Sequence, residues 1–260
     1  MPRWLLYGAN GFTGRRIAAE AVARGLSPVL AGRSAEAVRA LAEETGLEWR
    51  AFPLDDPAAL DAGLAGVDAV LLAAGPFSGT SRPVVDACLR NGVHYLDITG
   101  EIPVFEAIFA REAEAKRRGV ALLPGVGFDV VPTDCLAVSL ARALPGADRL
   151  ELAFASGGGP SAGTAKTMVE GLARGGAVRE GGRIRREPHG ARRRTIPFAD
   201  RPRRAMSIPW GDVATAYRST GIPNIVVYAP GPGWLPRVAR LARPVLGVGP
   251  VRRLVQRVIE

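Results

Sequence analysis

Three glycines near the start of the chain constrain its fold more than any other feature. Gly8, Gly11 and Gly14 lie between an apolar run at residues 4–7, which predicts a buried strand, and an amphipathic segment at residues 15–23, which predicts a helix. Gly8 permits a tight turn off the strand, Gly11 lets the backbone approach a pyrophosphate, and Gly14 allows close packing of helix on strand. The unpaired N–H groups and positive dipole end of the helix favour an anion. The sequence therefore predicts a dinucleotide site.

Apolar, strand-like runs continue to alternate with helical patterns up to residue 123. The expected strands are residues 4–7, 28–31, 49–52, 69–73, 94–98 and 120–123, and the expected helices are residues 15–23, 35–44, 57–64, 82–90 and 104–118. Continuous apolar strands separated by helices are typical of a parallel sheet that is covered on both faces. We predict an α/β fold, with a Rossmann-like doubly wound parallel sheet forming a dinucleotide-binding domain over residues 1–128.

The rhythm changes after Pro124 and predicts a smaller mixed α+β domain over residues 129–260, for substrate contact or dimerisation. The expected elements are helices at 133–143 and 164–174, strands at 150–155 and 225–228, and a hairpin at 178–186. Nine arginines between residues 183 and 204 fall on the hairpin and on an expected loop that follows it. They lack the interleaved aromatic residues of a nucleic-acid surface, so we expect solvated surface and no nucleic-acid partner.

The choice of cofactor is indicated at the end of the second expected strand. Enzymes that use NAD usually place a carboxylate there for the ribose 2′-hydroxyl, whereas this chain has Arg33 and Ser34. Arg33 can pair with a 2′-phosphate, Ser34 can donate a second hydrogen bond, and Arg15 can assist from the first helix. These residues predict NADP(H); the alternative is that Arg33 is a surface arginine without a ligand.

Further cofactor contacts are expected along the same edge of the sheet. Asp55 follows the third strand and is placed to meet the adenine, while Asp56 is expected to cap the next helix. The fourth strand leads to the nicotinamide-side ribose. The remaining expected cofactor residues are Asn10, Phe12 and Thr13 in the glycine loop, and Gly75, Pro76 and Phe77 after the fourth strand.

Several segments in combination resemble the saccharopine dehydrogenase-like oxidoreductases, and in particular the bacterial trans-acting enoyl reductases. They are residues 8–15, 31–33, 75–77, 94–101, 124–134 and 163–168. The resemblance covers nearly all of the chain. It implies a Rossmann domain, a second domain that contacts the substrate, and reduction of an enoyl or acyl-lipid-like substrate with NADPH. Family members usually continue beyond the position of Glu260, so we expect a shortened member or a fragment. No set of residues that would recognise several carboxylates can be identified, so a role in lysine biosynthesis is not expected.

Hydride transfer requires orientation rather than a side-chain catalyst, but reduction of a double bond also requires a proton. No tyrosine of the chain is followed four residues later by lysine, which excludes the classical short-chain dehydrogenase mechanism. Tyr95 and Asp97 at the end of the fifth strand and Lys166 in the second domain are the catalytic candidates, with Asp129 in addition. A structural role is the alternative for each. A non-catalytic NADP(H)-binding sensor or scaffold is the alternative for the whole chain.

Location and partners are less constrained by the sequence. The chain has no signal-peptide pattern and no apolar stretch long enough to span a membrane, and Cys88 and Cys135 lack metal or redox spacing. We therefore expect a cytoplasmic protein with no metal and two reduced core thiols. Residues 234–260 are basic and apolar, a pattern that fits an anionic membrane surface, a subunit contact or packing on further chain. A homodimer and a peripheral membrane contact both stay open.

Overall fold

The computed structural model describes residues 2–155, 171 and 175–231. The chain divides into two compact units, which we treat separately. Unit 1 comprises Met1–Thr99 and Pro103–Phe128, and unit 2 comprises Gly100–Ile102 and Asp129–Glu260. The helix expected at 164–174, apart from residue 171, and the basic, apolar stretch at 234–260 lie outside the described residues, so both stay predictions. Within the described ranges, no helix is long and apolar enough to cross a membrane.

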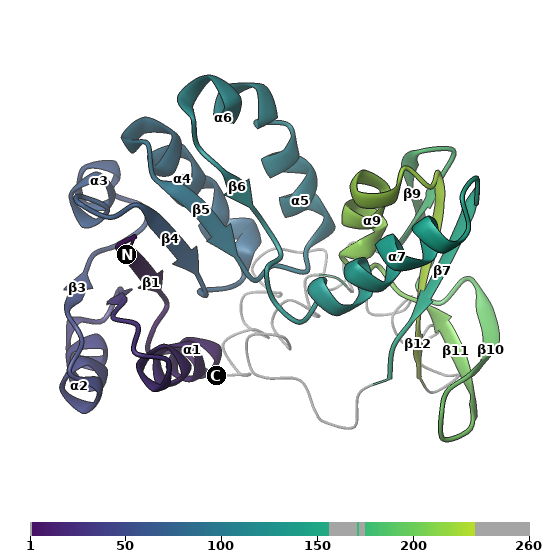
Figure 1. Cartoon of the computed structure of the whole chain (residues 1–260), viewed down its shortest axis with the longest axis horizontal. Helices are drawn as coiled ribbons and strands as arrows, with labels where there is room; N and C mark the ends of the chain where they lie inside the picture. The colour runs from purple at the N-terminus through teal and green to yellow at the C-terminus, as the bar shows by residue number, and fades with distance from the viewer. Residues whose placement is uncertain (1, 156–170, 172–174, 232–260) are drawn as a thin grey trace. The chain divides into compact units, whose positions relative to one another are not determined.

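Unit 1 is a six-stranded parallel sheet with connecting helices, which confirms the Rossmann-like prediction (Figure 1). The strand order is β3-β2-β1-β4-β5-β6. The elements in chain order are β1 Trp4–Tyr7, α1 Phe12–Ala23, β2 Val29–Gly32, α2 Ala35–Thr45, β3 Trp49–Ala51, α3 Pro57–Gly63, β4 Ala69–Leu72, α4 Phe77–Asn91, β5 His94–Asp97, α5 Ile102–Phe109, α6 Glu112–Arg118 and β6 Leu122–Leu123. The order reverses beside β1, so the carboxyl ends of β1 and β4 flank the switch point, where ligands bind in such sheets.

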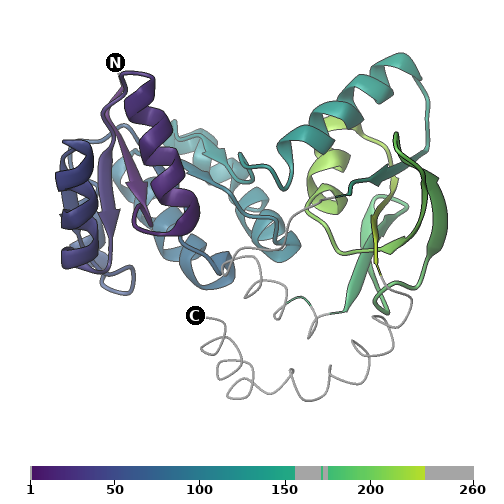
Figure 2. The same cartoon turned by 90° about the horizontal axis from the view of Figure 1, so that it is seen from below.

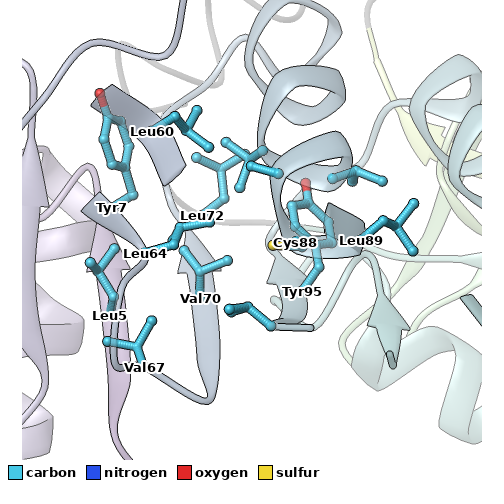
Figure 3. Close-up of a cluster of buried hydrophobic side chains, with 14 of the residues drawn as sticks. Leu5, Tyr7, Leu60, Leu64, Val67, Val70, Leu72, Cys88, Leu89 and Tyr95 are labelled. Atoms are coloured by element: carbon cyan, nitrogen blue, oxygen red, sulfur yellow. The ribbon is translucent and has the colours of Figure 1, made fainter. Parts of the chain in front are cut away.

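Hydrophobic clusters cover both faces of this sheet because successive strand residues point to opposite sides. Leu5 and Tyr7 of β1 belong to one cluster, together with Cys88 of α4, whereas Leu6 packs with Leu30 in the other. Figure 3 shows the first cluster, with Leu60 and Leu64 on the same side. Each fully buried leucine contributes about 1.5–3 kcal/mol to stability. This double covering holds the strand ends in fixed positions.

Some details differ from the sequence-based expectations. Helix α4 begins at Phe77 rather than at residue 82, and Pro83, which suggests a helix start, lies inside it. The single helix expected at 104–118 is divided into α5 and α6. On α1, Ala18 and Ala21 are buried, whereas Val22 is 42% exposed.

Unit 2 has helices beside a second, mainly antiparallel sheet of order β10-β11-β12-β8-β9, in which β7 also pairs with β12. The elements are α7 Val131–Ala143, β7 Arg149–Ala153, β8 Gly176–Glu180, β9 Arg183–Glu187, β10 Arg193–Pro197, β11 Pro202–Ser207, α9 Asp212–Thr220 and β12 Asn224–Pro230. Helices α7 and α9 lie side by side (Figures 1 and 2). The mixed α+β prediction is therefore confirmed.

Two expectations for unit 2 were wrong. The arginine-rich stretch expected as a loop forms the hairpin β10–β11, which is stabilised by pairing with β12. Its sequence lacks the apolar alternation that predicts a strand, so the pairing was hidden. Cys135, expected in the core, is exposed on α7, whereas Cys88 is buried as expected. Burial raises the pKa of the Cys88 thiol, which keeps it protonated and unreactive.

Candidate functional site

The glycine loop between β1 and α1 has the tight geometry that its sequence predicts. Gly8 has a φ of +86°, and a Cβ added to it would lie 2.9 Å from backbone atoms of Ala73 and Ala74. A Cβ on Gly14 would lie 2.1 Å from the Gly8 carbonyl oxygen. The Gly8 N–H donates to the Ala31 carbonyl at 2.8 Å, which fixes the turn against β2. A side chain at either position would push α1 away from the strands. The loop therefore requires glycine at both positions.

The start of α1 is left open for an anion. Gly11 is its N-cap and supplies no side chain, and the first turn contains no acidic residue. Arg15 closes the first turn by donating to the Gly11 carbonyl at 2.9 Å, so the N–H groups of residues 12–14 have no helical acceptor. Asn10 is exposed, Phe12 is 63% exposed and Thr13 is partly exposed at the same place. Backbone donors and the helix dipole therefore present positive charge to solvent.

Arg33 lies at the end of β2 with its side chain free to meet a ligand. It is exposed and has no ion-pair partner among the described residues. Burial raises the pKa of the Tyr7 hydroxyl to about 12, while Arg33 lowers it and Asp55 raises it, so both charged groups lie near this ring at one edge of the sheet. The Tyr7 hydroxyl itself donates to the Phe52 carbonyl at 2.8 Å. The edge thus carries an unpaired cation where a 2′-phosphate would be recognised.

The two residues expected to assist Arg33 have other partners. The Ser34 hydroxyl accepts a hydrogen bond from the Ala37 N–H at 3.3 Å and caps α2, although its own hydrogen can still be donated. Arg15 forms a salt bridge with Glu44 at 3.2 Å, which offsets part of its charge. Arg33 is therefore the main cation available at this edge.

The end of β4 turns into α4 through Gly75-Pro76, which are joined by a cis peptide bond. Pro76 is the N-cap of α4, and Gly75 is exposed. Phe77 is only 8% exposed and packs in the core of unit 1. Any contribution of Phe77 to ligand binding must therefore come from its backbone.

Tyr95 and Asp97, the first two catalytic candidates, form a buried pair with no exposed surface. The Tyr95 hydroxyl donates to Asp97 Oδ2 at 2.7 Å, and Asp97 Oδ1 accepts from the N–H groups of Thr99 at 3.0 Å and Gly125 at 2.8 Å. Burial raises the pKa of Asp97, while these three hydrogen bonds act to lower it. The pair ties the end of β5 to the loop after β6. These hydrogen bonds give the Tyr95–Asp97 pair a structural role, and its catalytic role stays a prediction.

A second group of acidic side chains lies in unit 2, at the beginnings of α7 and α9. Asp212 has no exposed surface, and both its carboxylate oxygens lack a hydrogen-bond partner among the described residues. Burial raises its pKa to about 7; the Thr133 hydroxyl opposes the shift, and Asp134 and Asp129 reinforce it. Asp129 is partly exposed, and burial raises its pKa as well. Lys166 lies outside the described residues.

Sequence reasoning missed Asp212 because an aspartate at the start of a helix looks like an ordinary capping residue. The sequence feature that could have indicated a buried Asp212 is the apolar stretch after it, in which Val213, Ala214 and Ala216 are fully buried. No group of three His, Cys, Asp or Glu side chains within the described ranges could hold a metal ion.

The comparisons with known proteins agree with this geometry. The family of the saccharopine dehydrogenase NADP-binding domain matches residues 4–123. Trans-acting enoyl reductases of Mycobacterium leprae and Mycobacterium tuberculosis are 35% and 33% identical over 147 residues, which cover 53% of this chain and 35% of each relative. Apo saccharopine dehydrogenase (L-Glu forming) from Saccharomyces cerevisiae has the same fold over 93% of this chain and 57% of that chain, with a TM-score of 0.66 and 15% identity.

This chain thus spans about a third of the length of these enoyl reductases. The match to the family model covers the strands, the glycine loop and the Arg33 edge together. Residues 4–123 therefore match the saccharopine dehydrogenase NADP-binding domain, and the cofactor of this domain is NADP(H).

Proposed function

We propose that this chain is part or all of an oxidoreductase that reduces an unsaturated acyl or lipid-like substrate with NADPH. One observation carries the proposal: an exposed, unpaired Arg33 lies at the strand end next to an uncapped helix N-terminus that has no carboxylate in its first turn. This arrangement suits a dinucleotide with a 2′-phosphate. The enoyl substrate class is supported by the names of the mycobacterial relatives.

In this proposal the residues of unit 1 bind the cofactor and orient it. The N–H groups at the start of α1 would hold the pyrophosphate, Arg33 would hold the 2′-phosphate, and the end of β4 would support the nicotinamide half. NADPH supplies a hydride when it is bound. Positioning of the donor carbon within about 3–3.5 Å of the acceptor then provides most of the acceleration.

The proton that completes the reduction needs a separate source. Tyr95 and Asp97 have no exposed surface, so neither contacts a ligand in this conformation. Asp129 is partly exposed, and burial raises the pKa of its carboxyl group. We therefore favour Asp129 as the donor, with Lys166 and water as the alternatives.

Binding measurements with Arg33→Gln test the cofactor edge. We expect NADPH to bind about 10- to 100-fold more weakly, because a charge-assisted pair with the 2′-phosphate is lost, and NADH to bind as before. The matched control is Arg39→Gln, which removes an exposed arginine of α2 that pairs with Glu43. An unchanged ratio of NADPH to NADH affinity in Arg33→Gln would contradict the assignment.

Transfer itself can be tested with NADPH that carries deuterium at C4 and a panel of enoyl thioesters. We expect deuterium in the saturated product and a lower turnover rate in Asp129→Asn with unchanged NADPH affinity. Tight NADPH binding without transfer to any member of the panel would overturn the reductase proposal and favour a sensor.

A further inference from the structure

A hollow on unit 2 has features of a ligand site that the dinucleotide chemistry does not use. It lies on the β10–β11 hairpin and has a volume of about 270 Å³. Its lining residues are Arg193, Arg194, Thr195, Arg204, Ala205, Met206 and Gly231. The volume is near the small end of the range for small-molecule pockets.

The strand register places four of these side chains on one face of the hairpin. Arg193 is opposite Met206, and Thr195 is opposite Arg204, in antiparallel pairing. Residues two apart on a strand share a face, so Arg193 and Arg204 are diagonal neighbours, about 7–8 Å apart at Cα. Arg193, Thr195 and Arg204 therefore share one face of the hairpin, and all three line the hollow.

The charges in and around the hollow are unevenly compensated. Arg194 pairs with Glu151, and the nearby Arg192 and Arg203 pair with Glu180 and Asp200. Arg193 and Arg204 have no ion-pair partner in the part of the chain that the structure describes. Two arginines that line the hollow thus carry positive charge that no described carboxylate compensates, and like charges on neighbouring strands repel each other until an anion neutralises them.

One wall of the hollow is apolar. Met206 is only 9% exposed, and its terminal methyl group lies so close to Gly231 that a Cβ there would be 2.1 Å from it. A ligand that fills the space must therefore combine a doubly charged anion, which can accept several hydrogen bonds, with a short apolar body. A phosphate monoester has this charge and geometry, and arginine matches its oxygens in bidentate fashion.

We propose that this hollow binds a phosphate monoester on an apolar chain through Arg193, Arg204 and the Thr195 hydroxyl. Two sources share this chemistry, a soluble alkyl or acyl phosphate ester and a lipid with a phosphate monoester headgroup. The inference does not depend on the proposed reductase activity.

Calorimetric titration of the whole chain with hexyl phosphate tests the site, with NADP⁺ at saturating concentration so that the dinucleotide site is occupied. We expect hexyl phosphate to bind at least tenfold more tightly than inorganic phosphate, because each buried CH₂ contributes about 0.8 kcal/mol, and hexanol not to bind. Equal affinity for inorganic and hexyl phosphate, or no binding of either, would overturn the proposal.

Variants decide whether the two arginines carry the binding. Arg193→Gln with Arg204→Gln should weaken hexyl phosphate binding at least tenfold and leave NADP⁺ affinity unchanged. Arg183→Gln is the matched control, because Arg183 is an exposed β9 arginine outside the hollow. A similar loss in the control would indicate general basicity and refute a built site.

Vesicles distinguish the two sources. Co-sedimentation with phosphatidic acid vesicles, but not with phosphatidylcholine vesicles, that disappears in the double variant would support the site and identify a lipid. Arginine-dependent binding of hexyl phosphate without co-sedimentation would support it and identify a soluble ester. Vesicle binding that survives in the double variant, without hexyl phosphate binding, would count against it.

Discussion

Two carboxyl groups of this protein are equally buried, yet their surroundings are opposite. Asp97, at the end of β5 in unit 1, accepts hydrogen bonds from one hydroxyl and two backbone N–H groups. Asp212, at the start of α9 in unit 2, has neither oxygen satisfied within the described residues. Burial raises the pKa of both, but only Asp97 has donors that oppose the shift strongly. The difference shows that hydrogen bonding, more than depth of burial, decides whether a buried carboxyl group fixes neighbouring backbone or holds a proton near neutral pH.

The largest effect is expected for Asp97→Ala. The substitution leaves three buried donors without an acceptor, so the free energy of unfolding should fall by about 3–5 kcal/mol. Denaturation by urea at pH 7 measures the loss. Asp55→Ala, at an exposed position in the same unit, is the control and should change stability by less than about 0.5 kcal/mol. A loss below about 1 kcal/mol for Asp97→Ala would contradict the stabilising role of the three hydrogen bonds that Asp97 accepts.

Asp212 should make stability depend on pH in the opposite sense to a salt-bridged acid. Its pKa is about 7 in the folded chain against an ordinary 3.8, so the folded chain binds more protons between these values. The stability contribution is therefore complete below about pH 4 and is lost as the pH rises through 7. From pH 5 to pH 8 the loss due to this group is about 3 kcal/mol.

Asp212→Asn isolates this effect from other titrating groups. The amide is neutral at every pH, so it cannot ionise as the carboxyl group does. We expect the variant to match the wild type below about pH 4 and to be more stable by about 4 kcal/mol at pH 8, as urea denaturation between these pH values would show. Parallel pH profiles for the two proteins would contradict a proton on Asp212.

The same contrast explains which parts of the molecule were predictable from sequence. The strands of unit 1 are short apolar runs, so their succession along the chain was predicted. The glycine loop was predicted as well, because its role depends on the backbone alone. The β10–β11 hairpin was missed because its stability comes from pairing with β12, which is distant in sequence. The hydrogen bond from Tyr95 to Asp97 and the unsatisfied burial of Asp212 were also hidden, because the surroundings of a buried group depend on which elements meet around it.

Tyr95→Phe separates the structural role of the Tyr95–Asp97 hydrogen bond from a role of Tyr95 in catalysis. The ring still packs, but one hydrogen bond to Asp97 is lost, so the free energy of unfolding should fall by about 1.5–3 kcal/mol and the pKa of Asp97 should rise further. If Tyr95 only positions the loop, the rate of hydride transfer measured in single turnover should stay within a few-fold of wild type. A loss of about 10²–10⁴-fold would instead support the predicted role as proton donor.

The smallest effect concerns the hydrogen bond that joins Ser219 of α9 to Asp134 of α7. The Ser219 hydroxyl of α9 donates to Asp134 Oδ2 of α7 at 2.6 Å, in an exposed position. Ser219→Ala removes this bond, and because water can replace the donor, we expect a loss of only about 0.5–1 kcal/mol. Urea denaturation at pH 7 measures this loss. A loss above about 2 kcal/mol would contradict the replacement of the Ser219 donor by water.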